Sequence, residues 1–226
     1  NDLDYQASAD SLVVYWAPTI EAELDYYEYS FSTTVGAEDI VPWTVTDSTM
    51  AVIDSLDLVH DQIYFSNLRA FDLAGNPSFV SSSDGITVDL HEPITGIVID
   101  GLSVDQTYTG SQDSLVVSWS EFADTVSGIQ YFEYGVGTTS GGLDIRNWTD
   151  IGPVTNINAD ALNLTDESTY YVSVRAIDGV GHVSGVVTTN GIIADHTGPS
   201  GTMVSDGDST DIELQNNLVS FSGHWE

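Results

Sequence analysis

The sequence predicts an all-β chain made of tandem antiparallel Greek-key β-sandwiches with minimal helix. Three observations predict this class: a pattern that repeats after about 100 residues, short stretches in which apolar and polar residues alternate, and turns that contain glycine or asparagine between those stretches. The chain has 226 residues, which suits two sandwich modules of about 100 residues each. We therefore expect two modules and the beginning of a third.

The internal repeat sets the expected module boundaries. Residues 10–16 (DSLVVYW) recur as residues 113–119 (DSLVVSW). Three further pairs match in the same order: 27–29 (YEY) with 132–134 (FEY), 68–72 (LRAFD) with 174–178 (VRAID), and 84–89 (DGITVD) with 190–195 (NGIIAD). The pattern restarts after Pro199. This predicts a module over 1–93 that lacks its first strand, a complete module over 94–199, and the first strands of a third over 200–226.

Alternation identifies the strands of each module. Leu115, Val117 and Trp119 alternate with Val116 and Ser118, which is typical of a strand with one buried face. Glycine-containing turns at 73–77 and 179–182 follow the last long strand of each copy. No window has the apolar spacing of an amphipathic helix.

The second half of each repeat resembles fibronectin type III modules, and more broadly the tandem immunoglobulin-like modules of exported bacterial proteins. The pattern is Leu-x-Leu, then a tyrosine, then Val-x-Val-Arg-Ala-x-Asp, followed by a glycine turn and an Asp-x-x-x-Pro junction. The resemblance implies that Tyr64 and Tyr170 form tyrosine corners, whose hydroxyls bond back across a turn. It also implies that Trp16 and Trp119 are core tryptophans.

The same resemblance predicts one ion pair in each module. The long strands that carry Glu28 and Arg69 are neighbours in this fold, as are those that carry Glu133 and Arg175. Each pair is expected to be a partly exposed cross-strand contact that contributes about 0.2–1 kcal/mol.

The charge balance limits the possible partners. The chain has 35 acidic and 3 basic residues, a formal net charge of −32, and no cysteine. Such a field repels nucleic-acid backbones and anionic lipid surfaces. The chain also has no apolar run of about 20 residues, so we expect neither nucleic-acid binding nor membrane insertion. Neighbouring modules, and identical subunits in a fibre, are the expected partners.

Carboxylates gather near the two expected module junctions. Calcium binds six to eight oxygen ligands, so it is the one cofactor that this pattern suggests. The alternative is that these aspartates form turns in an acidic chain, since no EF-hand loop is present. The candidate metal ligands are Asp84, Asp89 and Glu92 at the first junction, and Asp195, Asp206 and Asp208 near the second.

No pattern typical of catalysis is present, so we do not expect an enzyme. There is no Gly-x-Ser-x-Gly elbow and no cysteine nucleophile. Three functions remain: a non-catalytic spacer or stalk of a large extracellular or cell-surface adhesin-like protein, a fibre subunit that assembles head to tail by β-strand donation, and an accessory carbohydrate- or ligand-binding module of a secreted enzyme.

Overall fold

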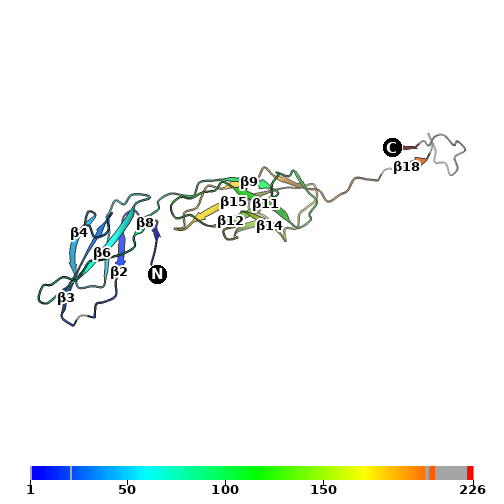
Figure 1. Cartoon of the computed structure of the whole chain (residues 1–226). Helices are drawn as coiled ribbons and strands as arrows, with labels where there is room; N and C mark the ends of the chain where they lie inside the picture. Colours follow the sequence, from blue (N-terminus) through cyan, green and yellow to red (C-terminus); the bar gives the residue numbers. More distant parts are fainter. Residues whose placement is uncertain (1, 21, 202–203, 207–222, 226) are drawn as a thin grey trace, which may run out of the picture.

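The computed structural model describes residues 2–20, 22–201, 204–206 and 223–225. Within these residues the chain forms strands and no helix, which confirms the all-β class predicted from the sequence. Figure 1 shows two separate sandwiches that follow one another along the chain. Each has its own apolar core, one between Leu12 and Val88 and the other between Val98 and Ala194. Among the described residues, no helix is long and apolar enough to cross a membrane.

The first module packs a large sheet against a two-stranded sheet. The small sheet pairs β2 (Leu12–Tyr15) with β5 (Met50–Ile53) in antiparallel register. The large sheet has the order β1 (Tyr5–Gln6), β8 (Ile86–Val88), β6 (Ile63–Asp72), β3 (Leu24–Ser32), β4 (Val41–Thr46), and β7 (Ser81–Ser82) also pairs with β6.

The second module repeats this arrangement and adds a strand. Its large sheet has the order β10 (Tyr108–Thr109), β17 (Ile192–Ala194), β15 (Thr169–Asp178), β12 (Ile129–Gly137), β13 (Arg146–Asp150), and β16 (Val187–Thr188) also pairs with β15. Its other sheet has three strands: β14 (Asn156–Ala159), β11 (Leu115–Ser120) and β9 (Ile97–Asp100). Beyond both modules, β18 (Val204–Asp206) pairs with β19 (Gly223–Trp225).

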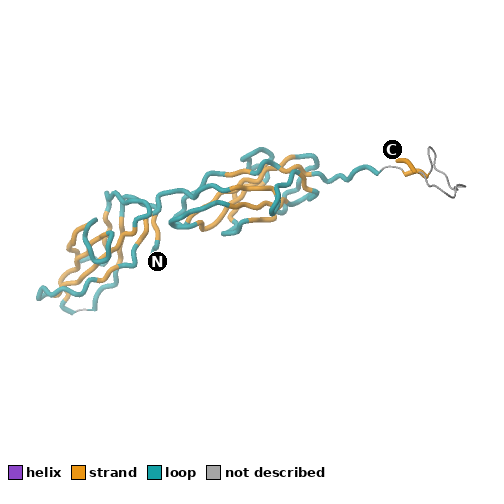
Figure 2. Tube along the Cα trace, turned by 45° about the horizontal axis from the view of Figure 1, so that its top comes forward, coloured by secondary structure: helices purple, strands orange, loops and turns teal. Residues whose placement is uncertain are grey.

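Alternation along β11 builds the core of the second module. Leu115, Val117 and Trp119 are buried, while Val116 is exposed on the other face. Burying such a side chain contributes about 1.5–3 kcal/mol. Figure 2 shows the strands of both modules linked by loops.

The two copies differ at the strand that carries the tryptophan. In the second module β9 pairs with β11 and places Val98 opposite Trp119, which is only 4% exposed. In the first module β2 has β5 as its one partner among the described strands. Trp16 packs against the first core but stays half-buried. This difference follows because no described strand equivalent to β9 covers that edge of the tryptophan.

Candidate functional site at the module junction

Asp89 connects the two modules through its side chain. It follows β8 directly and is completely buried. Its Oδ2 atom accepts two hydrogen bonds from Ser127 of the second module, from the backbone N–H at 3.2 Å and from the hydroxyl at 2.5 Å. One carboxylate of the first module therefore binds a loop of the second.

The other oxygen of Asp89 holds the chain that leaves the first module. Oδ1 accepts the backbone N–H of His91 at 3.2 Å, and Nδ1 of His60 lies 3.6 Å from it. The same Nδ1 accepts the N–H of Leu90 at 3.1 Å, and the rings of His60 and His91 lie in contact with centroids 3.7 Å apart and planes tilted by 35°. These contacts fasten the first residues of the linker to the first module.

The loop that carries Ser127 is shaped by another aspartate. Oδ1 of Asp124 accepts the N–H groups of Val126 at 3.1 Å and Gly128 at 2.7 Å. Gly128 has a φ of +72°, which a residue with a side chain rarely adopts. The N–H of Gly179 donates to the carbonyl of Gly128 at 3.0 Å, which ties this loop to the turn after β15.

Gly179 allows these two loops of the second module to approach. A Cβ atom built at this position would lie 2.7 Å from the carbonyl oxygen of Ser127, too close for a side chain. The corresponding residue in the first module is Leu73. The turn itself is held by Asp178, whose Oδ1 accepts the N–H groups of Val180 at 2.9 Å and His182 at 2.8 Å.

The linker is also fastened to the second module. Ile94 and Ala123 form a two-bond bridge, with N–O distances of 2.7 and 3.2 Å. Two residues later, a Cβ at Gly96 would lie 1.9 Å from the carbonyl oxygen of Ser120. Only glycine therefore lets the chain run this close to the end of β11.

The charges at the junction favour an ionised Asp89. Burial opposes ionisation, but the hydroxyl of Ser127, the N–H groups of His91 and Ser127, and the nearby imidazole of His182 outweigh it and hold the pKa of Asp89 below its usual value. An ionised carboxylate accepts stronger hydrogen bonds than a neutral one. The junction is therefore held by charge-assisted hydrogen bonds at neutral pH.

Asp89 also belongs to a group with metal-binding side chains. One ligand atom from each of Asp89, Asp178 and His182 lies within 4.8 Å of the others. Calcium prefers oxygen ligands only, whereas this group includes an imidazole nitrogen. Its carboxylate oxygens also have partners already: Ser127 and His91 for Asp89, the turn amides and Nδ1 of His182 at 3.0 Å for Asp178. The geometry fits a hydrogen-bonded contact better than a calcium site. We call the contact of Asp89 with Ser127 the latch.

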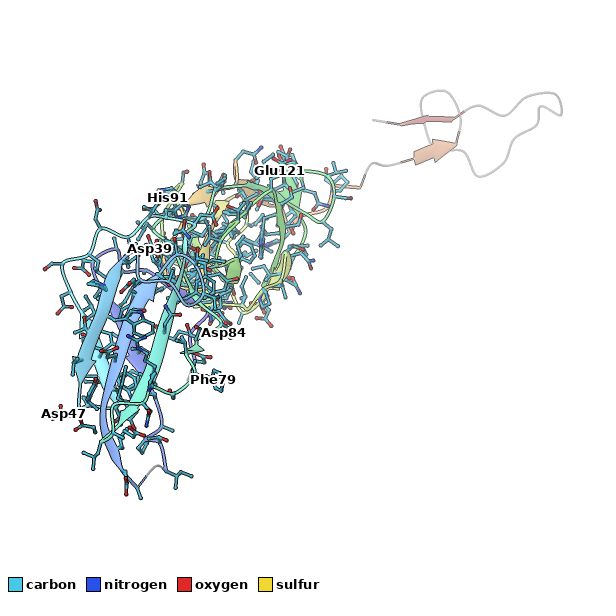
Figure 3. All side chains as sticks on the ribbon, turned by 60° about the vertical axis from the view of Figure 1, so that its left-hand side comes forward. Asp39, Asp47, Phe79, Asp84, His91 and Glu121 are labelled. Atoms are coloured by element: carbon cyan, nitrogen blue, oxygen red, sulfur yellow. The ribbon has the colours of Figure 1, made fainter. Side chains whose placement is uncertain are left out.

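The other predicted calcium ligands lie outside this group. Glu92 is exposed in the linker, and Asp195 is exposed at the far end of the second module. Asp84 is exposed on the loop before β8 and lies well apart from His91 (Figure 3). Asp208 lies outside the described residues, and of Asp206 only the backbone is described. Calcium binding at the junctions stays a prediction.

The tyrosines and ion pairs named from the sequence occupy equivalent places in the two modules. The N–H of Val59 donates to the hydroxyl of Tyr64 at 2.9 Å, and that of Thr165 donates to the hydroxyl of Tyr170 at 2.8 Å. In each module Nε of the arginine donates to the glutamate at 2.7 Å. The pairs are Arg69 with Glu28 and Arg175 with Glu133.

The same arginines also cover one tryptophan ring in each module. The guanidinium of Arg69 lies 4.3 Å from the ring centroid of Trp43, and that of Arg175 lies 4.3 Å from Trp148. These tryptophan faces are therefore occupied by cations of the chain itself.

The residues that build the junction were missed by sequence reasoning, apart from Asp89. Ser127 and Gly179 occur in ordinary-looking turns, and their role depends on a contact between modules. One signal was present: Gly179 replaces the Leu73 of the first copy, at a position where the repeat is otherwise well matched.

No protein-family model matches the chain, and no curated protein is similar enough to match it. Solved structures that resemble it include the fibronectin domains FN1–FN3 of chicken CNTN1. The sequence identity is 16% and the TM-score is 0.42. The match covers 85% of this chain and 65% of that one, so this chain spans less than two thirds of the length of its structural neighbour.

Proposed function

We propose that the chain is a non-catalytic structural segment of a large extracellular or cell-surface protein, in which it acts as a semi-rigid spacer or stalk. The observation that carries this proposal is the hydrogen-bonded contact of the buried Asp89 with the half-buried Ser127 across the junction. Modules of one chain usually move relative to one another unless their contact is extensive or specific. A latch of this kind favours one mutual orientation.

The linker supports the same function. Leu90 is hydrogen-bonded to His60 of the first module, and Ile94 is hydrogen-bonded to Ala123 of the second. Few residues between them are free to act as a hinge. Repetition of such a unit would extend a protein in regular steps.

The charge of the chain suits an exposed segment in a salty medium. With 35 acidic and 3 basic residues, neighbouring chains repel one another, which keeps them soluble and apart. The two modules of one chain are acidic as well, and their repulsion would also extend the chain without a latch. The experiment has to separate this effect from the latch.

Small-angle X-ray scattering of the full chain tests the spacer at 50 mM and 500 mM NaCl. High salt screens repulsion beyond about 5 Å. We expect an elongated particle with the two modules end to end, and an unchanged maximum dimension at high salt. A compact particle at either salt concentration would contradict the proposal. A particle that is elongated at 50 mM and compact at 500 mM NaCl would show that charge repulsion causes the extension.

A second candidate is a fibre subunit that accepts a β-strand from its neighbour. It is favoured by the edge of β2, which has no partner among the described strands on the side where the second module places β9 on β11. A hollow of about 390 Å³ lies beside this edge, lined in part by Val13, Tyr15 and Ser83. An added strand would satisfy the free backbone groups there.

Sedimentation velocity over a range of concentrations tests strand donation. We expect polymers of the full chain and monomers of a chain shortened to residues 1–199. A full chain that stays monomeric, or polymers that persist after the deletion, would count against donation by the third repeat.

A further inference from the structure

The second module contains a buried carboxylate that the junction does not use. Asp100 is the last residue of β9, where the chain leaves β11 and crosses to β17 of the opposite sheet. Gly101 makes the turn with a φ of +110°, and its N–H donates to the carbonyl of Val116 at 2.7 Å. A Cβ at Gly101 would lie 2.6 Å from the carbonyl oxygen of Val104, so the crossover is tightly closed.

The side chain of Asp100 lies inside the sandwich. It has the same inward phase as Val98, it is 0% exposed, and neither carboxylate oxygen has a hydrogen bond of regular geometry with a described residue. The hydroxyl of Thr189 and the N–H of Gly191 are its polar neighbours. Buried polar groups without partners are costly and rare, so this one requires an explanation.

A second carboxylate stands beside it. Oδ1 of Asp105 accepts the N–H of Asp100 at 3.1 Å, and its Oδ2 accepts the side-chain amide of Asn190 at 2.7 Å. Each oxygen accepts one of the two hydrogen bonds that it can accept. Asp105 therefore closes the crossover loop and still has lone pairs available near Asp100.

The arginines of the chain do not neutralise this pair. The sequence has only three of them. Arg69 and Arg175 bind glutamates, and Arg146 contacts the hydroxyl of Tyr134 and the carbonyl of Asp160. No arginine of the chain therefore supplies a positive charge to Asp100.

We propose that Asp100 and Asp105 bind a hard divalent cation, with calcium as the best match. The donors at the crossover are oxygens: two carboxylates and the hydroxyl of Thr189, with no thiolate. Hard cations prefer such ligands, and calcium accepts them in irregular arrangements. The ion would join the crossover to the segment between β16 and β17, inside one module, independently of the latch and of the spacer function.

The spacing of the two aspartates recurs in the sequence. The pattern Asp-Gly-x-Ser-x-Asp occupies residues 100–105 and again residues 206–211. The second occurrence begins at Asp206, which the sequence suggests as a junction ligand. Asp206 therefore also matches Asp100 in the crossover pattern.

Thermal unfolding of the full chain with CaCl₂ or EDTA tests the site. Ionic strength is matched with NaCl, and MgCl₂ is run in parallel. We expect calcium to raise the Tm of the second module by at least about 4 °C. The shift should be lost in Asp100→Asn and in Asp105→Asn, and retained in Asp160→Asn, which removes an exposed carboxylate from the same module. Isothermal titration with CaCl₂ should show one site fewer in the first two variants than in the third.

The Asp100→Asn variant should be folded in EDTA, because an amide of the same size removes an unpartnered buried charge. If that variant does not fold, Asp105→Asn decides the question by titration, since its amide oxygen can still accept the N–H of Asp100. An absent calcium shift in the wild-type chain would overturn the proposal. An equal calcium response in the wild type and both crossover variants would also overturn it, because the ion would then bind elsewhere.

Discussion

Each tyrosine corner depends on one hydroxyl, and it can be removed without changing the ring. The hydroxyl of Tyr170 accepts the N–H of Thr165, and its ring is buried in the second core. Tyr170→Phe leaves that N–H without its acceptor, so we expect a loss of about 1 kcal/mol from the unfolding free energy of the second module. Urea unfolding followed by fluorescence measures the change.

The matched variant is Tyr64→Phe, which removes the same bond in the first module. It should lower the stability of that module by a similar amount and leave the second transition in place. If neither variant shifts either transition, the hydroxyls contribute no net stability.

The buried Asp100 gives the second module an unusual pH dependence in EDTA. Burial raises the pKa of this carboxyl to about 6, with help from the charge of Asp105 and against the hydroxyl of Thr189. The folded state therefore keeps a proton that the unfolded state releases near pH 3.8. This group's contribution is fully present below pH 3.8, declines as pH rises to about 6, and is constant above that, a loss of roughly 2–3 kcal/mol.

Chemical unfolding of the wild type and Asp100→Asn at pH 4, 5, 6 and 7, all in EDTA, isolates this contribution. The stability of the wild type relative to the variant should fall between pH 4 and 6 and level off. A difference that is independent of pH would mean that Asp100 is ionised throughout this range.

At the scale of strands, an ion pair and a stacked tryptophan link β12, β13 and β15 in the second module. Arg175 donates to Glu133 and lies over Trp148, and the side chains of the ion pair are 27% and 19% exposed. A double-mutant cycle with Arg175→Ala and Glu133→Ala should give a coupling free energy of about 1 kcal/mol, at the upper end for partly exposed pairs. Arg175→Ala alone should cost more than Glu133→Ala, because it also uncovers Trp148.

The equivalent cycle with Arg69 and Glu28 is the internal control, since the two modules share this geometry. If the coupling free energy disappears at 500 mM NaCl in both modules, each ion pair behaves as a surface pair whose attraction is screened by salt. Equal costs of the two single substitutions in the second module would contradict a role for the stacked ring.

Sequence patterns predicted the structure best where the order of residues along one strand, or a match between the two copies, is enough to place a side chain. Alternation indicated the buried face of β11, and the repeat aligned the two tyrosines and the two arginines. The phase of β9 also indicates that Asp100 points inward, but an acidic residue there conflicts with the usual composition of a core. The surroundings of its carboxylate depend on residues that are distant in the sequence: Thr189 lies beside Asp100, and Asn190 binds the neighbouring Asp105.

The junction was harder to predict for a physical reason. A hydrogen bond between Asp89 and Ser127 requires two modules to meet in one orientation, and no local pattern encodes that orientation. The sequence suggests Asp89 as a calcium ligand because carboxylates gather near the expected junction. The exposed Asp195 ends the equivalent segment of the second module. Among the described residues it accepts hydrogen bonds from Thr197 and from no residue of another module, whereas Asp89 binds Ser127 of the next module.

For the whole molecule, the latch should determine how much the modules move relative to one another. The chain has no cysteine, so Asp47→Cys on the first module and Asp160→Cys on the second allow specific nitroxide labelling at exposed positions. Pulsed electron paramagnetic resonance then measures the distance distribution between modules. We expect a narrow distribution in the otherwise unchanged chain and a broad one in Asp89→Ala, which removes both bonds to Ser127.

The matched control is Asp195→Ala, which removes the exposed counterpart and should leave the distribution narrow. Acid provides an independent test of the same carboxylate. The pKa of Asp89 is lowered by its bonds to Ser127 and His91, so its contribution to docking is present above pH 3.8 and is lost as pH falls through the lowered value. The labelled chain should therefore broaden only at pH values below 3.8, while both modules keep their β-sheet circular dichroism. A distribution that is equally narrow in Asp89→Ala would mean that the bridge between Ile94 and Ala123 fixes the modules without the latch.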